Sequence, residues 1–320
     1  MNQITAGIFI AWILAAPARA EPVTLDWVPI PGGCFQMGDE RIYPEEGPPH
    51  EACVSSFEMT RTEVSNRQFA AFVRATGYVT RAEKGSQSID ASSAEPGLPP
   101  GSAVFRPPQS PPSPNRSLTD LSWWRFVEGA NWRLPEGPEG PRADPDAPVV
   151  HLTREDTMRF AAWAGGRLPT ETEWEFAARG TDTKQAQLPE GQAATNQANT
   201  WQGIFPVINT GDDGYTDLAP VGSFPANRYG LHDMIGNAWE WTSSAYAPSH
   251  SPQDRSLAGE IGFDPNQPGA TVGTIKGGSY LCARSYCYRY RSAARQAQDV
   301  SFGTSHIGFR VVRDLQTSSD

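Results

Sequence analysis

Glycine and proline recur along the whole chain and limit how long any helix or strand can become. The 320 residues include 30 glycines and 29 prolines, nearly one residue in five, where about one in eight is usual. Both residue types disfavour the interior of regular elements, glycine through its freedom and proline through its missing donor. The 10 tryptophans, 9 tyrosines and 14 phenylalanines can still build a core, which argues against collagen or disorder. We therefore expect a folded, loop-rich protein.

The first twenty residues are predicted to be a cleaved secretory signal. Residues 8–16 form an apolar run that is too short to span a membrane, and Ala-Arg-Ala at 18–20 is typical of a cleavage site before Glu21. Residues 1–3 lack the usual basic residue, so a buried first strand remains an alternative. We expect a secreted or periplasmic mature chain, residues 21–320, without a membrane span. Cleavage removes one charged residue, Arg19, and changes the net charge from −10 to −11, which argues against a nucleic-acid binder.

Four cysteines would meet an oxidising environment in an exported protein, and they can pair in three ways. Cys34 and Cys53 lie in two segments that both predict strands near the start of the mature chain. We predict a structural disulfide between them, with two buried free thiols as the alternative. Cys282 and Cys287 form a second, closely spaced pair.

Three helices are predicted from an N-terminal capping box and a glycine at or beyond the end. The capping residues and the closing glycines are Ser65 with Gly77, Thr153 with Gly165, and Thr170 with Gly180. The apolar positions expected on the inner faces are Phe69, Phe72 and Val73, then Phe160, Ala161 and Trp163, then Trp174, Ala177 and Ala178.

A Ser/Pro-rich run occupies residues 83–114 and contains three Pro-Pro pairs. Such a run cannot form a helix interior or a central strand, so we expect a long surface excursion. Aromatic residues resume at Trp123, Trp124 and Trp132, and neither a shift in composition nor an internal repeat separates two cores. The sequence favours one α+β domain.

Two acidic, glycine-bearing segments, residues 209–215 and 233–240, could offer carboxylate and carbonyl oxygens to a hard cation such as Ca²⁺. Neither has EF-hand spacing, so plain turns are the alternative. The five histidines fall in no HxH or HxxxH spacing, which argues against a histidine zinc site. A GxSxG nucleophile motif is also missing from the sequence.

Residues 277–291 are dense in reactive side chains. Cys282 and Cys287 lie among Arg284, Arg289 and Arg291, and guanidinium charge lowers a thiol pKa and favours thiolate. Two thiolates are two ligands short of a tetrahedral zinc site, whereas Cu(I) accepts two soft thiolates and can admit a third ligand. An ordinary disulfide is the alternative, since paired cysteines in exported proteins usually form one.

Four segments together resemble the formylglycine-generating enzymes, also called sulfatase-modifying factors. They are the cysteine segment, the helix sequence RLPTETEWE at 167–175, the run GLHDMIGNAWEWT at 230–242 and the ending GFR at 308–310. The likeness extends from about Trp27 to Arg313. The helix and the ending are widespread in a superfamily of differing activities. The CxxxxC motif among Arg and Tyr residues, in contrast, looks particular to the enzymes that make formylglycine.

The resemblance implies a compact fold related to C-type lectins, in a monomer, with little regular secondary structure. It also implies an activity: with O₂ and a thiol reductant, the enzyme oxidises a cysteine in a CxPxR-type motif of an unfolded sulfatase polypeptide to Cα-formylglycine. By match to the family motif, Cys282 and Cys287 would hold Cu(I), and the substrate thiolate would join them.

Other roles also follow from the resemblance. Ser279 matches the serine beside the reacting oxygen, Trp239 the tryptophan that faces the metal, and Tyr286 and Arg284 the neighbouring cleft. Calcium ligands would be Asn199, Thr200, Asp213 and Tyr215 at one site, and Asp233, Gly236, Ala238 and Glu240 at another. At Thr200, Tyr215, Gly236 and Ala238 the ligand would be the main-chain carbonyl.

The chain departs from the family pattern at two places. Residues 296–301, QAQDVS, replace a usual Asn-Thr-Pro-Asp run near the expected peptide cleft, and Thr153-Arg154 replaces Ser-Trp. The first change bears on substrate preference more than on copper chemistry. A non-catalytic, lectin-like binding module is the alternative function, although it leaves the CxxxxC unexplained. A relative with non-haem iron, like the ergothioneine-forming members, would need a histidine cluster that the sequence does not show.

Overall fold

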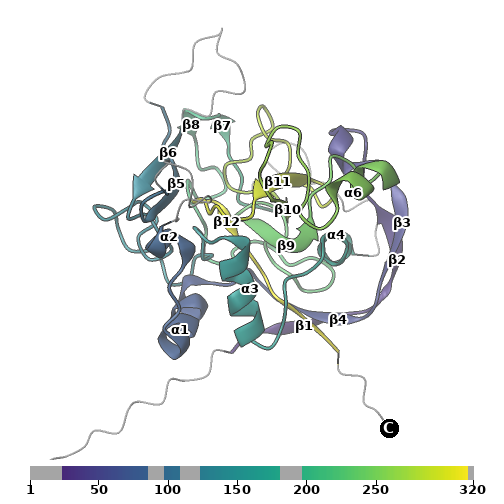
Figure 1. Cartoon of the computed structure of the whole chain (residues 1–320), viewed down its shortest axis with the longest axis horizontal. Coiled ribbons are helices and arrows are strands. Elements are labelled where there is room, and N and C mark those ends of the chain that lie inside the picture. Colours follow the sequence, from purple (N-terminus) through teal and green to yellow (C-terminus); the bar gives the residue numbers. More distant parts are fainter. Residues whose placement is uncertain (1–23, 86–96, 109–122, 181–196, 316–320) are drawn as a thin grey trace, which may run out of the picture.

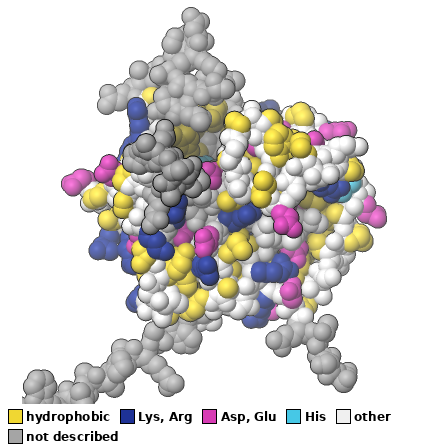
Figure 2. Space-filling model, viewed as in Figure 1, with side chains coloured by type: hydrophobic (Ala, Val, Ile, Leu, Met, Phe, Trp, Pro, Cys, Tyr) yellow, Lys and Arg dark blue, Asp and Glu magenta, His cyan; other side chains and the backbone are white. Residues whose placement is uncertain are grey.

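The structure, a computed structural model, describes residues 24–85, 97–108, 123–180 and 197–315. The predicted signal at 1–20 lies outside the described residues, as do two parts of the Pro-rich run. Within the described ranges, no helix is long and apolar enough to cross a membrane. Lys and Arg side chains are interspersed with Asp and Glu over the face shown in Figure 2.

The helices are short and separated by long loops (Figure 1). They are α1 (Asn66–Thr76), α2 (Arg81–Lys84), α3 (Arg154–Trp163), α4 (Glu171–Arg179), α6 (Pro252–Ala258) and the 3₁₀ turn η1 (Pro44–Glu46).

The three predicted helices are confirmed as α1, α3 and α4, each opened by the predicted capping box. One expectation for their inner faces is wrong. Trp163 is 37% exposed, and its ring lies against Phe72 and Phe160 from the outside. The helices α2 and α6 were not predicted, because elements of four and seven residues carry too little periodicity to be recognised from the sequence.

The strands form one three-stranded sheet, one four-stranded sheet and three two-stranded ribbons. In the first sheet β4 (Phe57–Thr60) pairs antiparallel with β1 (Trp27–Ile30) and β13 (Val312–Asp314). The second has the order β11 (Arg295–Asp299), β10 (Val272–Lys276), β9 (Trp239–Ala245) and β12 (Ile307–Gly308), with only β12 parallel to its neighbour.

The ribbons are β2 (Gly33–Met37) with β3 (His50–Val54), β5 (Gly101–Phe105) with β6 (Trp124–Glu128), and β7 (Gly203–Ile204) with β8 (Ile208–Asn209). Figure 1 shows β2–β3 and β5–β6 on opposite sides of the four-stranded sheet. This mixture of short elements in one domain confirms the predicted α+β class.

Cys34 and Cys53 stand directly opposite each other in the β2–β3 ribbon and form a disulfide. The predicted pairing is confirmed. Both residues are exposed, so the bond fastens a surface ribbon and does not lie in the core.

The middle of the Pro-rich run is not a surface excursion. β5 lies between Pro100 and Pro107 and contains no proline, so it can pair with β6. Val104 is fully buried, and the amide of Phe105 donates to Ser305 Oγ at 3.1 Å. The average composition of the run therefore did not predict this buried strand of five residues.

The core is organised around a buried ion pair between β9 and the segment after β12. Arg310 is fully buried and donates to both oxygens of Glu240, each at 2.7 Å. The indole Nε1 of Trp174 on α4 donates to the same carboxylate at 2.6 Å. Three segments far apart in the sequence are therefore joined at one carboxylate.

We predict that Arg310→Met lowers the free energy of unfolding by about 3–5 kcal/mol, since it leaves the Glu240 carboxylate buried without a counter-charge. Arg313→Met is the matched control. Arg313 pairs with Glu58 but its side chain is 41% exposed, so its loss should cost about 1 kcal/mol or less. Urea unfolding of both variants measures the difference, and equal losses would contradict the central role of Glu240.

Candidate active site

The cysteine segment follows β10 through two glycines with positive φ, Gly277 and Gly278. A Cβ at Gly278 would lie 2.9 Å from the Cα of Tyr290, so this close approach needs glycine. The chain then makes two tight turns, in which the amide of Cys282 donates to Ser279 O and that of Cys287 to Ala283 O, both at 2.8 Å. These turns bring the two cysteine side chains to one place.

The Sγ atoms of Cys282 and Cys287 lie 2.7 Å apart, and both residues are free thiols. Cys282 and Cys287 therefore do not form a disulfide here, which was the alternative that the sequence left open. Cys282 is buried in the main apolar cluster, which also contains Trp239, whereas Cys287 is partly exposed.

The two thiols differ in acidity. Burial raises the pKa of Cys282 well above its usual value, and its hydrogen bond to Cys287 adds to the rise. The same hydrogen bond, followed by the positive charge of Arg289, holds the pKa of Cys287 below its usual value despite burial. Cys287 is therefore the thiol that ionises first, and it would be the first to offer a thiolate to a soft metal.

Of the three arginines predicted around the pair, Arg289 lowers the pKa of both thiols, and Arg291 adds a smaller lowering at Cys287. Arg289 pairs with Glu45 and its guanidinium lies 3.9 Å from the ring centre of Tyr43. Arg291 is buried and pairs with Glu46, so much of its charge is neutralised. Arg284 lies at the surface.

The acidic partners Glu45 and Glu46 belong to η1, some 245 residues away in the chain. Glu45 and Glu46 were not predicted as site residues. They can be seen in the sequence directly after Pro44, but nothing in the sequence indicates that they pair with Arg289 and Arg291.

An aromatic wall borders the cysteine pair. The Tyr286 ring stacks on Phe205 with centres 4.3 Å apart and an interplanar angle of 11°, and its edge contacts Trp123 at 5.4 Å. Burial raises the pKa of Tyr286 to about 12, so its hydroxyl keeps its proton at neutral pH. The backbone of the neighbouring loop is tied to the site, because the amide of Trp201 donates to Cys282 O at 3.1 Å. Phe205 and Trp123 were not recognised from the sequence.

Ser279 and Trp239 are both buried near the pair. The Ser279 hydroxyl accepts a hydrogen bond from the amide of Leu281 at 3.3 Å, one turn before Cys282. Trp239 begins β9 and packs in the same apolar cluster as Cys282. Of the six site residues predicted, five thus converge on one region, and Arg284 lies at its outer edge.

Two neutral histidines lie behind this region. His151 is fully buried with Nδ1 2.9 Å from Ser102 Oγ, and His306 has Nδ1 2.8 Å from Thr304 Oγ1. The carbonyl of His306 accepts from the amide of Trp239 at 2.9 Å. Burial lowers the pKa of both imidazoles to about 3. In the part of the chain that the structure describes, no group of three or more His, Cys, Asp or Glu side chains is arranged to hold a metal ion.

The first set of expected calcium ligands fits a cation. Asn199 Oδ1 is buried without a hydrogen-bond partner among the described residues. The carbonyl and hydroxyl of Thr200 and the carboxylate of Asp213 all accept from the single amide nitrogen of Gln202, the last at 2.7 Å. The partly positive amide of Gln202 thus holds several oxygen atoms at one place, and oxygen atoms are the ligands that Ca²⁺ prefers.

The carboxylates of the second set already have partners within the protein. Glu240 gives both oxygens to Arg310, so its charge is already neutralised by a buried guanidinium. Asp233 accepts from the amides of Gly222 and Phe224. The assignment of Glu240 as a calcium ligand stays a prediction, and in this structure the carboxylate joins structural segments.

The two departures from the family pattern meet in one hollow of about 690 Å³ beside α3. Val300 and Ser301 line it together with Arg154, whose amide donates to Val300 O at 3.1 Å. None of the six predicted active-site residues lines this hollow, so Val300 and Ser301, the last two residues of the changed segment, lie beside α3.

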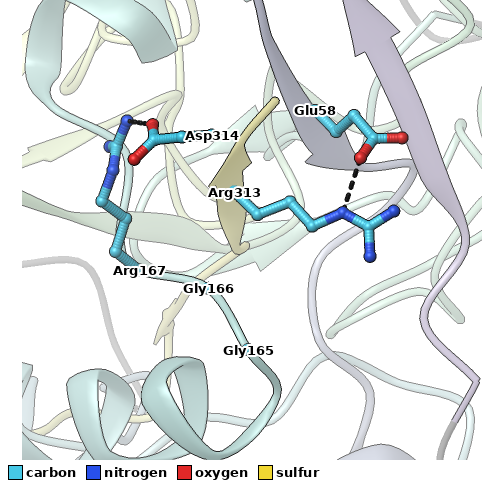
Figure 3. A pocket seen from close by; sticks show the side chains of 6 residues that line it. All are labelled: Glu58, Gly165, Gly166, Arg167, Arg313 and Asp314. Atoms are coloured by element: carbon cyan, nitrogen blue, oxygen red, sulfur yellow. Dashed lines mark hydrogen bonds and ion pairs between the residues drawn. The ribbon is translucent and has the colours of Figure 1, made fainter. Parts of the chain in front are cut away.

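A second hollow of about 590 Å³ lies between the loop after α3 and the strand β13 (Figure 3). Its charged side chains are paired, Arg313 with Glu58 and Arg167 with both Asp314 and Glu173. A ligand there would have to displace these ion pairs, so we assign it no function.

The sequence matches the sulfatase-modifying factor enzyme 1-like domain family over residues 15–315. It is 44% identical over 301 residues to the formylglycine-generating enzyme of Mycobacterium tuberculosis, covering 90% of this chain and 97% of that protein. The chain belongs to this family.

A relative whose name marks it as inactive also matches this chain. The inactive C-alpha-formylglycine-generating enzyme 2 of Mus musculus is 33% identical over 97% of this chain and 93% of its own length. Among solved structures, PvdO from Pseudomonas aeruginosa has a TM-score of 0.58 at 23% identity, covering 90% of this chain and 94% of that one, which confirms the fold alone. Family membership therefore leaves the activity to be argued from the site.

We predict that the stability of the family fold falls on acidification because of His306. Its pKa is about 3 when folded and near 6.5 when unfolded, so the unfolded chain binds more protons between these values. Stability is then lost as the pH falls from about 6.5 towards 3. In His306→Asn, the loss of unfolding free energy between pH 7 and pH 5 should be about 2 kcal/mol smaller. Urea unfolding at the two pH values measures it, and an unchanged loss would contradict the assignment.

Proposed function

We propose that this protein is a copper-dependent oxidase that converts a cysteine, in a CxPxR-type motif of an unfolded sulfatase polypeptide, into Cα-formylglycine. The observation that carries the proposal is the pair of free thiols, Cys282 and Cys287, held 2.7 Å apart between an apolar core and an aromatic wall. The family relationship to proteins named for this activity supports the same conclusion.

The donor chemistry of the pair suits Cu(I). In the described residues each thiol has the other as its side-chain hydrogen-bond partner, and the lowered pKa of Cys287 provides a soft thiolate. Cu(I) bound by Cys282 and Cys287 would supply one-electron chemistry with O₂ that side chains lack. We propose that the substrate thiolate joins the two cysteines there.

The remaining site residues act on the substrate and on water. Trp239 belongs to the buried apolar cluster that also contains Cys282, and we propose that this cluster keeps water away from the inner side of the thiols. The Tyr286 hydroxyl stays protonated and can donate a hydrogen bond, while Ser279 offers a second hydroxyl beside the pair. Oxidation of the cysteine side chain to an aldehyde releases two electrons and breaks its C–S bond, and the sulfur leaves as hydrogen sulfide. Reduction of O₂ to water takes four electrons, so an external thiol reductant supplies the other two. O₂, the reductant and the sulfatase polypeptide are thus the proposed partners.

A lectin-like binding module is the second candidate, because a mouse relative carries a name that marks it as inactive. That function would need neither the close approach of two free thiols nor the acidity of Cys287. The site therefore favours the enzyme, and loss of the thiols separates the two functions.

We predict that Cys282→Ala and Cys287→Ala each abolish turnover and high-affinity Cu(I) binding in a folded protein, because one soft ligand cannot hold the metal. Ser279→Ala should lower turnover about 10–100-fold and keep copper, as expected for a residue outside the metal's ligands. Ser285→Ala, at an exposed serine in the same segment, is the control.

The assay follows the aldehyde by mass spectrometry on a CxPxR peptide with O₂, Cu(I) and a thiol. Copper affinity is measured in parallel against a competing chelator. Full turnover by either single cysteine variant would overturn the oxidase and leave the binding module as the better account.

We further propose that Ca²⁺ binds at Asn199, Thr200, Asp213 and Tyr215 and supports the surrounding loops. EDTA should then lower the melting temperature by about 5–10 °C. Asp213→Asn should remove most of this effect, whereas Asp212→Asn, at the exposed neighbouring position, should retain it. Unchanged melting with EDTA and no retained calcium in metal analysis would contradict the site.

The proposed location is secreted or periplasmic, with the mature chain starting at Glu21. Intact mass of protein recovered from an exporting host tests the cleavage. The proposed oligomeric state is a monomer.

A further inference from the structure

The ribbon β7–β8 presents two exposed isoleucines side by side. Ile204 and Ile208 face each other across the strand pair, so they lie on the same face of the ribbon. Their side chains are 63% and 51% exposed. Single exposed apolar residues are common on proteins, but a cross-strand pair forms one continuous apolar surface.

This ribbon is held firmly to the cysteine segment. Phe205, the residue after Ile204, stacks on Tyr286, which precedes Cys287. At the base of the ribbon the amide of Trp201 donates to Cys282 O, and the amide of Thr210 donates to Gln202 O at 2.8 Å. The ring stack and the hydrogen bond to Cys282 O therefore join the ribbon to the cysteine segment.

The ribbon also has open strand edges. Among the strands that the structure describes, β7 and β8 pair only with each other. An extended polypeptide can add to such an edge through main-chain hydrogen bonds, with alternate side chains directed onto the neighbouring surface. Figure 1 shows β7 and β8 at the end of the fold opposite β1 and β4.

We propose that Ile204 and Ile208 form a docking surface for apolar residues of the unfolded sulfatase that flank the cysteine motif. The proposal rests on the proposed function and adds a specificity-determining surface to it. The ribbon is joined to the wall that borders the thiols through the stack of Phe205 on Tyr286, and we expect a chain leaving the site past these rings to reach the isoleucines. An unfolded sulfatase exposes apolar residues that its folded form buries, so this surface favours substrate that has not yet folded.

The test compares two peptides. Both contain the same CxPxR motif, but one is about 8 residues long with Gly/Ser flanks and the other about 25 with Leu and Val in both flanks. We predict that Ile204→Ser/Ile208→Ser raises KM for the long peptide about tenfold with kcat unchanged, since docking away from the reacting atoms contributes equally to substrate and transition state. KM for the short peptide should not change.

Leu257→Ser/Ile261→Ser is the matched control, because these residues are 63% and 65% exposed on and after α6. It should leave both peptides unaffected. Equal KM changes for the two peptides in the ribbon variant, or no change with the long peptide, would overturn the docking surface. A loss in the control equal to that in the ribbon variant would do the same.

Failure of the proposed function can be distinguished. If the unaltered protein oxidises neither peptide, the oxidase is wrong, and docking is then measured by fluorescence anisotropy of the long peptide with its cysteine replaced by serine. Binding that the ribbon variant weakens supports the surface, and equal binding overturns it. Sedimentation of both proteins addresses a second copy of the chain as occupant, and a dimer lost only in the ribbon variant would also overturn the proposal.

Discussion

The carboxylate of Glu240 is the contact on which the rest of the structure depends. It lies in β9, the strand that begins with Trp239 at the site, and it binds Arg310 and Trp174. Arg310 in turn donates to the carbonyls of Thr60 and His232. A single buried anion therefore orients a sheet, a helix and two loops, in a fold whose short elements bury little area against one another.

Buried charge extends this role to the inner face of α4. Glu175 binds Lys276 at 2.9 Å and Arg179 at 2.8 Å, while Glu171 binds Arg295 at 2.6 Å. Burial alone would raise the pKa of Glu171, but Arg295 holds it well below its usual value, so the pair stays ionised. Because Lys276 ends β10 immediately before Gly277, this network also sets where the cysteine segment starts.

The site follows from these supports. The thiol pair itself needs only two local turns, but its surroundings come from distant parts of the chain. Glu45 pairs with Arg289, and the ring of Phe205 stacks on that of Tyr286. The thiols are thereby placed between a dry core and an accessible aromatic wall. Cys287 is the more acidic thiol because its hydrogen bond to Cys282 and the charge of Arg289 lower its pKa.

The sequence by itself determined what depends on neighbouring residues. Capping boxes such as Ser65 with Gln68, and the approach of Cys282 to Cys287, involve groups three to five positions apart, whose geometry is set by local backbone preferences. Only the tertiary structure decided that Glu240 binds Arg310, and that a strand lies within the Pro-rich run. Partners 70 or more residues apart are selected by which side chains packing brings together, and composition or spacing does not record that choice.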